Sequence, residues 1–536
     1  MTQTWVRERK PGASGVPVLR LGLALGLGAI QTMAFHHTWM WWLPPLTVMW
    51  LVSQLNRCSL PHHRSVRDAA WLSGAFALGW LTTGVWWLFV SMHQYGHLPA
   101  WLAAAAVVLL TTALSAYLAL AGAGYAAWRT GKPGWDAGLF ASLWALAECA
   151  RGLLGTGFPW VASGYAGVDA PWGALAPWVG VYGMGAVMAG LSAWLTGVWG
   201  APGVQQASGD ARTGHRWRTS VVLGVGLVVG LGALDHWGRI EFTHSAGKFT
   251  VSLIQTQVAQ DEKFSLERVP SNLAWLAHAL RESGGDLVVT PETAVPLLPS
   301  QMQDVAPEWW ASQVAHFEQS NRAALVGVPL GDFSNGYTNS VVGLAQQAPY
   351  RYDKHHLVPF GEFIPSGFRW FTQLMNLPLG DFERGRVGAP SFLALGQRLA
   401  PNICYEDLFG EELAARFREP ALAPTVLVNV SNIAWFGDTV ALPQHLNITR
   451  LRTMELQRPM LRATNTGVTA IVDHTGRVVK ALPPSSRGVL HGEVEGRSGL
   501  TPYAWWAGQA GLWPLMGVAL AMVGWVRHLS RRLAAA

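Results

Sequence analysis

The chain has 536 residues, of which 50% are hydrophobic and only 13% are charged, and it contains 29 tryptophans. This composition excludes an ordinary soluble enzyme, and the length is too great for one compact core. The formal net charge of +6 is accounted for by cations in short loops between apolar segments, so it does not indicate a nucleic-acid surface. The sequence therefore predicts a membrane protein with an additional folded domain.

Eight apolar runs approach or exceed the length of about 17–25 residues that a helix needs to cross the hydrocarbon core. They lie at about 17–35, 39–56, 69–92, 100–128, 134–152, 172–200, 219–234 and 504–526. This pattern predicts a membrane domain at 1–236 with seven transmembrane helices and a separate domain at 237–503. A C-terminal transmembrane helix with a basic tail is expected at 504–536.

The short loops that carry arginine and lysine all fall on one side of the membrane if the N-terminus is cytoplasmic. These cations are Arg57, Arg64, Arg67, Arg129, Lys132, Arg212, Arg216, Arg218, Arg527, Arg531 and Arg532. The opposite loops at 35–38 and 93–98 contain neither residue type. We therefore expect both termini in the cytoplasm and segment 237–503 outside it. No small-residue cleavage site follows the first run, so a cleaved signal peptide is not favoured.

Segment 237–503 alternates predicted strands with helices and turns. Strands are expected at 251–255, 286–290, 323–330, 339–345, 397–404, 425–431 and 469–474. A helix with apolar spacing at 272–283 stops at the following glycine pair. In such α/β layers, active-site residues gather at the carboxyl ends of strands.

Three reactive side chains stand near predicted strand ends, and they are Glu292, Lys354 and Cys404. A carboxylate, an ammonium and a thiol can act as base, oxyanion partner and nucleophile, which is sufficient for acyl transfer through a thioester. Cys404 is the only cysteine of its segment, so it has no partner for an intradomain disulfide. Taken singly, Lys354 also fits a solvated surface lysine and Cys404 a small buried apolar residue.

Histidine pairs offer the only pattern that suggests a metal site. His36 adjoins His37 and His62 adjoins His63, but adjacent histidines in loops lack the spacing that closes a site on one helix or strand. The chain also contains no CxxC or HExxH pattern. No metal and no cofactor are therefore expected.

Glu292, Lys354 and Cys404, in this order and context, resemble the nitrilase superfamily, and further segments of the chain resemble the apolipoprotein N-acyltransferase family, which belongs to it. The matching segments are RGLLGTGFPWVASGYAGVDAP, DKHHLVPFGEFIP, ICYEDLFGE, SNIAWFGD, QHLNITRLRTMELQRPMLRATNTGVTA and LTPYAWWAG. They extend over most of the chain. The resemblance implies a four-layer α-β-β-α sandwich inserted between transmembrane helices, with seven helices before it and one after it.

The resemblance also implies a reaction. The acyl donor would be a membrane phospholipid, and the acceptor would be the α-amine of the S-diacylglyceryl cysteine that begins an apolipoprotein. Glu292 would accept the thiol proton of Cys404, while Lys354 and a backbone N–H near Tyr405 would stabilise the oxyanion. The implied location is the bacterial inner membrane with the catalytic domain in the periplasm, and a monomer is expected.

The family pattern assigns weaker roles to further residues. Supporting roles fall on Glu362, Tyr405 and Glu406, each of which could instead be a structural hydrogen-bond partner. Substrate contacts are implied for Phe264 and for Trp435, and ordinary packing is an equal alternative for Trp435. Phe264 stands where the family commonly has tryptophan, and Ile433 replaces an acid. These departures concern headgroup or acceptor contacts rather than the reaction type.

Glu148 and Arg151 lie one helical turn apart near the outer end of the run at 134–152. Charged groups at membrane depth usually face a cavity or a partner. We interpret them either as a mutual ion pair or as residues that hold the phospholipid headgroup.

Two other protein classes compete with this interpretation. A membrane-tethered amidase would use the same three residues with water as the acceptor, although its soluble homologues need no lipid-facing spans. A transporter would use the spans themselves, but intramembrane ionisable groups are few and no internal repeat is evident.

Overall fold

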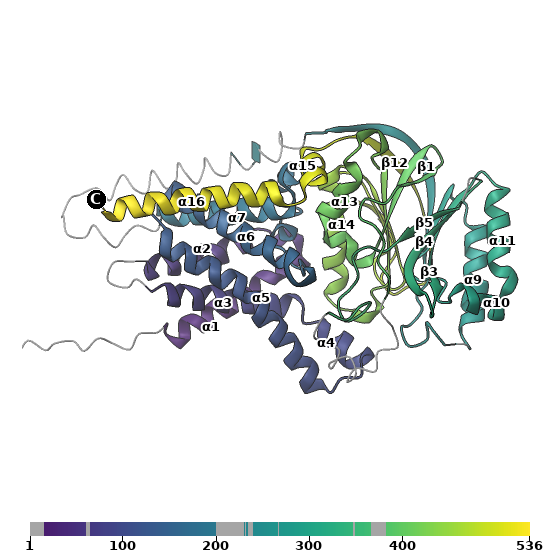
Figure 1. Cartoon of the computed structure of the whole chain (residues 1–536), viewed down its shortest axis with the longest axis horizontal. Coiled ribbons are helices and arrows are strands. Elements are labelled where there is room, and N and C mark those ends of the chain that lie inside the picture. The colour runs from purple at the N-terminus through teal and green to yellow at the C-terminus, as the bar shows by residue number, and fades with distance from the viewer. Residues whose placement is uncertain are drawn as a thin grey trace, which may run out of the picture.

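A bundle of long helices lies at one end of the molecule, and a double β-sheet with its own helices lies at the other (Figure 1). The computed structural model describes residues 16–59, 65–199, 230, 232–233, 240–265, 267–346, 349–365 and 382–535. The predicted span at 219–234 falls almost entirely outside the described residues, as do the loop cations Arg64, Arg212, Arg216 and Arg218.

The bundle confirms that the first part of the chain consists of apolar helices. Its members are α1 (Val18–Ile30), α2 (Leu43–Cys58), α3 (Val66–Gly84), α4 (Leu88–Val90), α5 (Ala100–Trp128), α6 (Pro133–Leu153) and α7 (Ala176–Trp199). Within the described residues, four helical segments are long and apolar enough to cross a membrane, or up to six if each of two bent pairs is one span. The α2 helix, with 16 residues, is not among the four.

Two of the predicted spans are bent rather than straight. The run at 69–92 turns by 58° between α3 and the segment Leu88–Tyr95. The run at 504–526 turns by 90° between α15 (Pro502–Ala510) and α16 (Trp513–Ala535). Gly511 follows α15 with φ 57°, a left-handed conformation that glycine adopts without strain at helix ends. The residues of α15 pack against a β-sheet, whereas α16 continues along the bundle. An apolar run predicts that a segment is buried, but it does not predict whether other helices, a β-sheet or lipid buries it.

The second part of the chain forms two six-stranded sheets that face each other. The first has the order β12-β1-β2-β3-β4-β5 and the second β11-β10-β9-β8-β7-β6. The strands of the first sheet are β1 (Thr243–Gln255), β2 (Leu287–Val289), β3 (Ala323–Asp332), β4 (Gly336–Leu344), β5 (Tyr350–Asp353) and β12 (Gly488–Gly499). Those of the second are β6 (Phe392–Ala394), β7 (Gln397–Ile403), β8 (Val426–Ser431), β9 (Met460–Thr464), β10 (Ala470–Val472) and β11 (Val478–Ala481).

Helices cover the outer face of each sheet, so the predicted four-layer α-β-β-α sandwich is present. The first sheet carries α9 (Val269–Glu282), α10 (Pro299–Val305) and α11 (Pro307–Glu318), and the second carries α13 (Gly410–Ala414), α14 (Ala441–Leu456) and α15. Side chains that alternate along each strand contribute to two separate hydrophobic cores, one between the sheets and one under the outer helices. Leu287 and Val289 pack between the sheets, whereas Val288 packs against the outer helices, because successive side chains of a strand point to opposite faces. Each fully buried side chain of this size contributes about 1.5–3 kcal/mol.

The α14 helix lies between the second sheet and the bundle, and a polar residue on it joins the two parts (Figure 1). The indole N–H groups of Trp87 and Trp160 donate to Gln444 Oε1 at 3.1 and 2.8 Å, and Gln444 Nε2 donates to the Gly84 carbonyl at 3.1 Å. Buried amides are costly unless they are paired, so this network fixes the sandwich on the bundle. The sequence did not predict α14, because its many polar residues leave no clear apolar periodicity.

Helices α1 and α3 cross at two glycines. A Cβ added at Gly79 would lie 1.9 Å from the Leu25 carbonyl oxygen, and one added at Gly28 would lie 1.9 Å from the Phe76 carbonyl oxygen. Small residues allow helix backbones to approach this closely in membranes.

We therefore expect Gly79→Ala to lower the thermal stability of the detergent-purified protein, because overpacking at a backbone contact costs about 1–3 kcal/mol. Gly74→Ala, on the same helix, is the matched control, since its Cβ would meet Ala119 Cβ at an ordinary 3.4 Å. A melting temperature of Gly79→Ala equal to or above that of Gly74→Ala would contradict the close crossing.

Candidate active site

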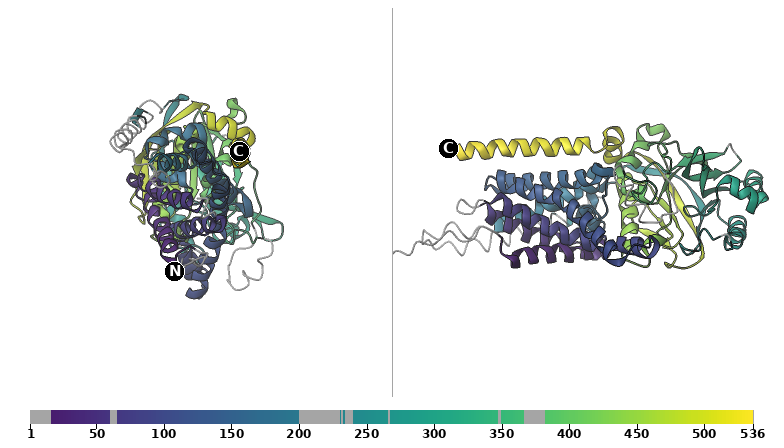
Figure 2. Two further views of the ribbon diagram at one scale, coloured as in Figure 1. Left: turned by 90° about the vertical axis from the view of Figure 1, so that its left-hand side faces the viewer. Right: turned by 60° about the horizontal axis from the view of Figure 1, so that its bottom comes forward.

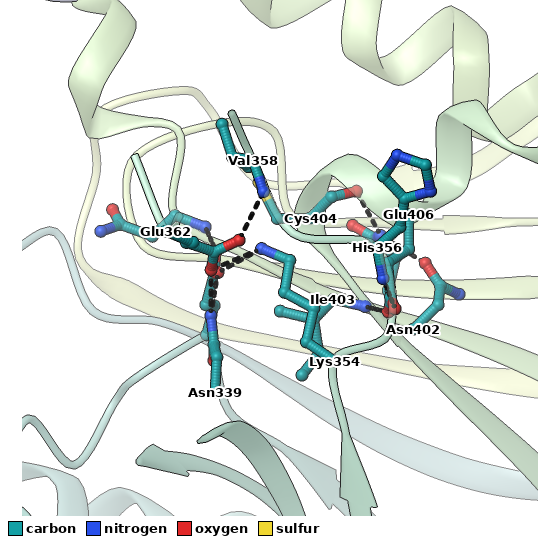
Figure 3. Close-up of polar contacts among 12 residues, drawn as sticks. Asn339, Lys354, His356, Val358, Glu362, Asn402, Ile403, Cys404 and Glu406 are labelled. Carbon is teal, nitrogen blue, oxygen red and sulfur yellow. Dashed lines mark hydrogen bonds and ion pairs between the residues drawn. The ribbon is translucent and has the colours of Figure 1, made fainter. Parts of the chain in front are cut away.

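The sandwich brings Glu292, Lys354 and Cys404 to one edge of the two sheets. Glu292 follows β2, Lys354 directly follows β5 and Cys404 directly follows β7. The first two belong to one sheet and the third to the other, so only the face-to-face packing of the sheets makes them neighbours. Figure 3 shows the Lys354 ammonium pointing towards Glu362, with Cys404 beside them.

The Glu292 carboxylate is buried and has a partner on each oxygen. Lys354 Nζ lies 3.2 Å from Oε1, and Asn339 Nδ2 donates to the same oxygen at 2.7 Å. The backbone N–H of Asn432 donates to Oε2 at 2.8 Å. Burial by itself raises the pKa of Glu292, but Lys354, Lys263 and the Asn339 hydrogen bond outweigh it and bring this pKa below its ordinary value. The carboxylate is therefore ionised and able to accept a proton.

The Lys354 ammonium is 1% exposed and lies between two carboxylates. Its Nζ donates to Glu362 Oε1 at 2.9 Å, in addition to its contact with Glu292. Asn339 Nδ2 also donates to Glu362 Oε1 at 2.8 Å, and the Val358 N–H donates to Oε2 at 2.8 Å. Burial opposes the charge of Lys354, but the two carboxylates outweigh it and raise the Lys354 pKa. Glu362 is thus in direct contact with the ion-pair cluster.

Cys404 occupies a strained turn between β7 and a short 3₁₀ helix, Cys404–Leu408. Its φ of 53° lies in the left-handed region, which is uncommon for residues other than glycine and costs on the order of 1–3 kcal/mol. Burial, and next the charge of Glu292, raise the pKa of the Cys404 thiol, which Lys354 opposes. The resting group is therefore a thiol, and it needs a base to become a nucleophile.

Glu406 holds the turn after Cys404 and the loop after Lys354 together. Its Oε2 accepts hydrogen bonds from the Ile403 N–H at 2.6 Å and the Tyr352 hydroxyl at 2.7 Å. Its Oε1 accepts from the His355 N–H at 2.6 Å and the His356 N–H at 3.1 Å. These four contacts give Glu406 a structural part in aligning the two reactive residues.

Tyr405 connects the nucleophile turn to the helical bundle. Its hydroxyl donates to the Gly157 carbonyl at 3.0 Å. His356 Nε2 lies 2.9 Å from the Thr156 carbonyl oxygen in the same loop, and the His356 ring stacks on Phe409 at 3.5 Å. The loop after α6 therefore contacts residues on both sides of the site.

Glu148 and Arg151 are buried in α6, and their polar contacts within the described residues organise the loop 158–163. Arg151 Nη1 donates to the carbonyl oxygens of Phe158 and Trp160 at 2.8 and 2.7 Å. Glu148 accepts from the backbone N–H and the hydroxyl of Ser163 at 2.7 and 2.6 Å. The pair is 3.4 Å apart. These contacts indicate a structural role for Glu148 and Arg151. Their predicted role in holding the phospholipid headgroup stays a prediction.

Phe264 directly follows Lys263 in the turn after β1, and Trp435 lies in a short 3₁₀ helix, Ala434–Phe436, that follows β8. Phe264 is 46% exposed, and the partly exposed Trp435 ring meets Tyr95 edge-on at 5.8 Å. Neither residue has a polar contact with the ion-pair cluster among the described residues, so their substrate contacts also stay predictions.

Three residues that the sequence analysis did not select complete the cluster, namely Asn339, Asn432 and Lys263. Asn339 and Asn432 lie within or just beyond predicted strands, but asparagine at a strand end gives no signal of its partner. Lys263 directly precedes Phe264, so the family position that Phe264 occupies could have drawn attention to its neighbour. Within the described part of the chain, no group of three His, Cys, Asp or Glu side chains is placed to hold a metal ion.

Comparison with known proteins matches both parts of the chain. Residues 27–194 match the family model of the apolipoprotein N-acyltransferase N-terminal domain, and residues 250–503 match the carbon-nitrogen hydrolase model. The double sheet is therefore a nitrilase-like domain, as the motifs predicted.

Proteins named apolipoprotein N-acyltransferase are similar over nearly the full length. The protein of Verminephrobacter eiseniae is 47% identical over 514 residues, covering 92% of this chain and 93% of the relative. That of Ralstonia nicotianae is 44% identical over 506 residues, covering 92% and 91%. That of Nitrosomonas europaea is 37% identical over 493 residues, covering 90% and 93%. The chain belongs to the apolipoprotein N-acyltransferase family.

Proposed function

We propose that this protein transfers an acyl chain from a membrane phospholipid, through a thioester on Cys404, to the α-amine of an S-diacylglyceryl cysteine at the start of an apolipoprotein. The observation that carries the proposal is the buried cluster of Glu292, Lys354 and Glu362 beside Cys404. Membership of the acyltransferase family supports lipoprotein N-acylation as the overall reaction.

In the first half-reaction, Glu292 accepts the thiol proton, and the Cys404 thiolate attacks the ester carbonyl of the phospholipid. Lys354 and the backbone N–H of Tyr405 stabilise the tetrahedral oxyanion. When the intermediate collapses, the carbon–oxygen ester bond breaks, and the leaving lysophospholipid takes the proton from Glu292. The product is the Cys404 thioester.

In the second half-reaction, the α-amine of the apolipoprotein attacks the thioester carbonyl and gives a proton to Glu292. The same donors stabilise the second oxyanion. Its collapse breaks the carbon–sulfur bond, forms the amide and returns the proton to the Cys404 sulfur. Each half-reaction thus restores the charge state of the base, as a ping-pong cycle requires.

The membrane arrangement follows the loop charges. We propose seven transmembrane helices in 1–236, a periplasmic catalytic domain at 237–503, and a last helix with a cytoplasmic tail in 504–536, in a monomer. The far end of α16, with its basic residues, lies away from the sandwich (Figure 2), which supports opposite sides for the catalytic domain and the C-terminus. The long apolar helices that adjoin the sandwich support a membrane lipid as the donor.

The nucleophile can be tested with phospholipid alone. Incubation of the purified protein with phospholipid should add one acyl mass to the Cys404 peptide, detected by mass spectrometry. Cys404→Ala should lose this adduct and all transfer to a diacylglyceryl peptide, because no other thiol lies in the catalytic domain.

Cys58→Ala is the matched control and should retain both the adduct and the transfer, since Cys58 lies in α2 of the bundle. Acylated peptide formed by Cys404→Ala would contradict the thioester. Release of free fatty acid without acylated peptide in the native protein would favour the amidase-like alternative.

The roles of base and oxyanion partner can be separated by half-reaction. Glu292→Gln keeps the shape but cannot accept a proton, so we expect acyl-enzyme formation to fall by on the order of a hundredfold or more. Lys354→Met should slow both half-reactions by a similar factor. Rapid-quench measurement of thioester formation and of its aminolysis provides the comparison.

Glu308→Gln, on the exposed side of α11, should leave both rates unchanged. Normal thioester formation by Glu292→Gln would show that another group is the base.

The topology predicts opposite outcomes for two reporter fusions. Alkaline phosphatase, which is active only outside the cytoplasm, should be inactive when fused after Gly131 and active when fused after Ser300, because the basic loop at 129–132 is placed inside. Activity after Gly131, or its loss after Ser300, would overturn the assignment.

A further inference from the structure

Lys263 is a buried cation that the proposed mechanism does not use. It lies in the turn that follows β1 and is 6% exposed, whereas its neighbour Phe264 is 46% exposed. Lysine is almost never buried without a partner, because removing an ammonium from water is costly. The turn therefore directs the lysine inward at the place where the sequence predicted a substrate-contacting aromatic residue.

The partner of Lys263 is the backbone of the proposed base. Lys263 Nζ donates to the Glu292 carbonyl oxygen at 3.0 Å. The next residue, Thr293, has a φ of 49°, which is an outlier for a β-branched residue. The loop after β2 is thus held in a strained conformation, and Lys263 fixes the peptide group that joins Glu292 to Thr293.

The charges around the Glu292 carboxylate explain why a second cation is needed. Four titratable groups surround this carboxylate. Two come from the first sheet beyond β5, namely Lys354 and Glu362. The other two are Cys404 at the end of β7 and Lys263 in the turn after β1. Lys354 is shared between two carboxylates. One ammonium cannot neutralise both, and Lys263 restores the balance.

We propose that Lys263 is a positioning residue for acyl transfer, which holds the Glu292 loop and keeps the Glu292 carboxylate ionised so that it can take the proton of Cys404. This inference rests on the proposed function of Glu292 as the base. Lys263 acts through Glu292 and needs no contact with either substrate.

The electrostatic effects of burial and of the neighbouring charges agree with this geometry. Burial lowers the pKa of Lys263 to about 8, and the charges of Glu292 and Cys404 oppose that fall. Lys263 in turn helps to hold the pKa of Glu292 below its ordinary value. Removal of the cation therefore raises the Glu292 pKa, and a higher pH is then needed to ionise the base.

The test is the pH dependence of acyl-enzyme formation, measured as the rate of the Cys404 acyl adduct with excess phospholipid from about pH 3, below the ordinary pKa of a glutamate, to about pH 9. Lys263→Gln keeps a hydrogen-bond donor without the charge, Lys263→Met removes both, and Lys263→Arg keeps both. We expect the acid limb of the profile to move to higher pH by about one unit in the Gln and Met variants. The Arg variant should retain the native limb.

Lys248→Gln, at an exposed ion pair in β1, is the matched control and should give the native profile. A lower rate at every pH without a shift of the limb in Lys263→Gln would show that the role is only structural, and it would overturn the proposal. If the Met variant does not fold, the comparison of Lys263→Gln with Lys263→Arg still tests the charge, because both side chains can donate a hydrogen bond and only arginine is charged. Absence of any adduct in the native protein would instead overturn the thioester mechanism on which the inference depends.

Discussion

The structure depends on the burial of one ammonium group between two carboxylates. Lys354 is removed from water at the edge of the sandwich, where it contacts Glu292 and Glu362. An uncompensated charge there would cost several kcal/mol, so both acids must be held in place. The first sheet supplies the loops that carry them, and Asn339 bonds to both carboxylates. The same arrangement leaves an ionised carboxylate near Cys404, which the proposed role of Glu292 as the base requires.

A second constraint joins this cluster to the membrane part. Glu406 aligns the backbone around Cys404 with the loop after Lys354, and Tyr405 continues that alignment to the Gly157 carbonyl in the bundle. In the first turn of α14, Gln444 accepts hydrogen bonds from two tryptophans of the bundle. The proposed lipid substrates require a site with a fixed position relative to the membrane helices, and these buried polar contacts supply that position through specific partners.

The sequence was most informative where the pattern is local. The segments 286–290 and 425–431 are rich in valine and leucine, and they appear as β2 and β8 within one residue at each end. Strands with mixed or short patterns, such as β5, β6 and β12, were not predicted. The apolar runs of the bundle were found, but the bends that follow α3 and α15 were not. Helix direction depends on what covers each face, and that information lies elsewhere in the chain.

The amino-acid sequence is sufficient to identify the reactive residue types, the strand-end positions of Glu292 and Cys404 and, through the motifs around Lys354 and Cys404, the family. The environment of these residues follows from the packing of the two sheets. Glu292 receives a hydrogen bond from Asn432, 140 residues away, and the inward direction of Lys263 next to an exposed Phe264 has no signature in the local sequence. Secondary structure follows from neighbouring residues, whereas charge, burial and acidity at a site follow from groups that only the packing of the two sheets brings together.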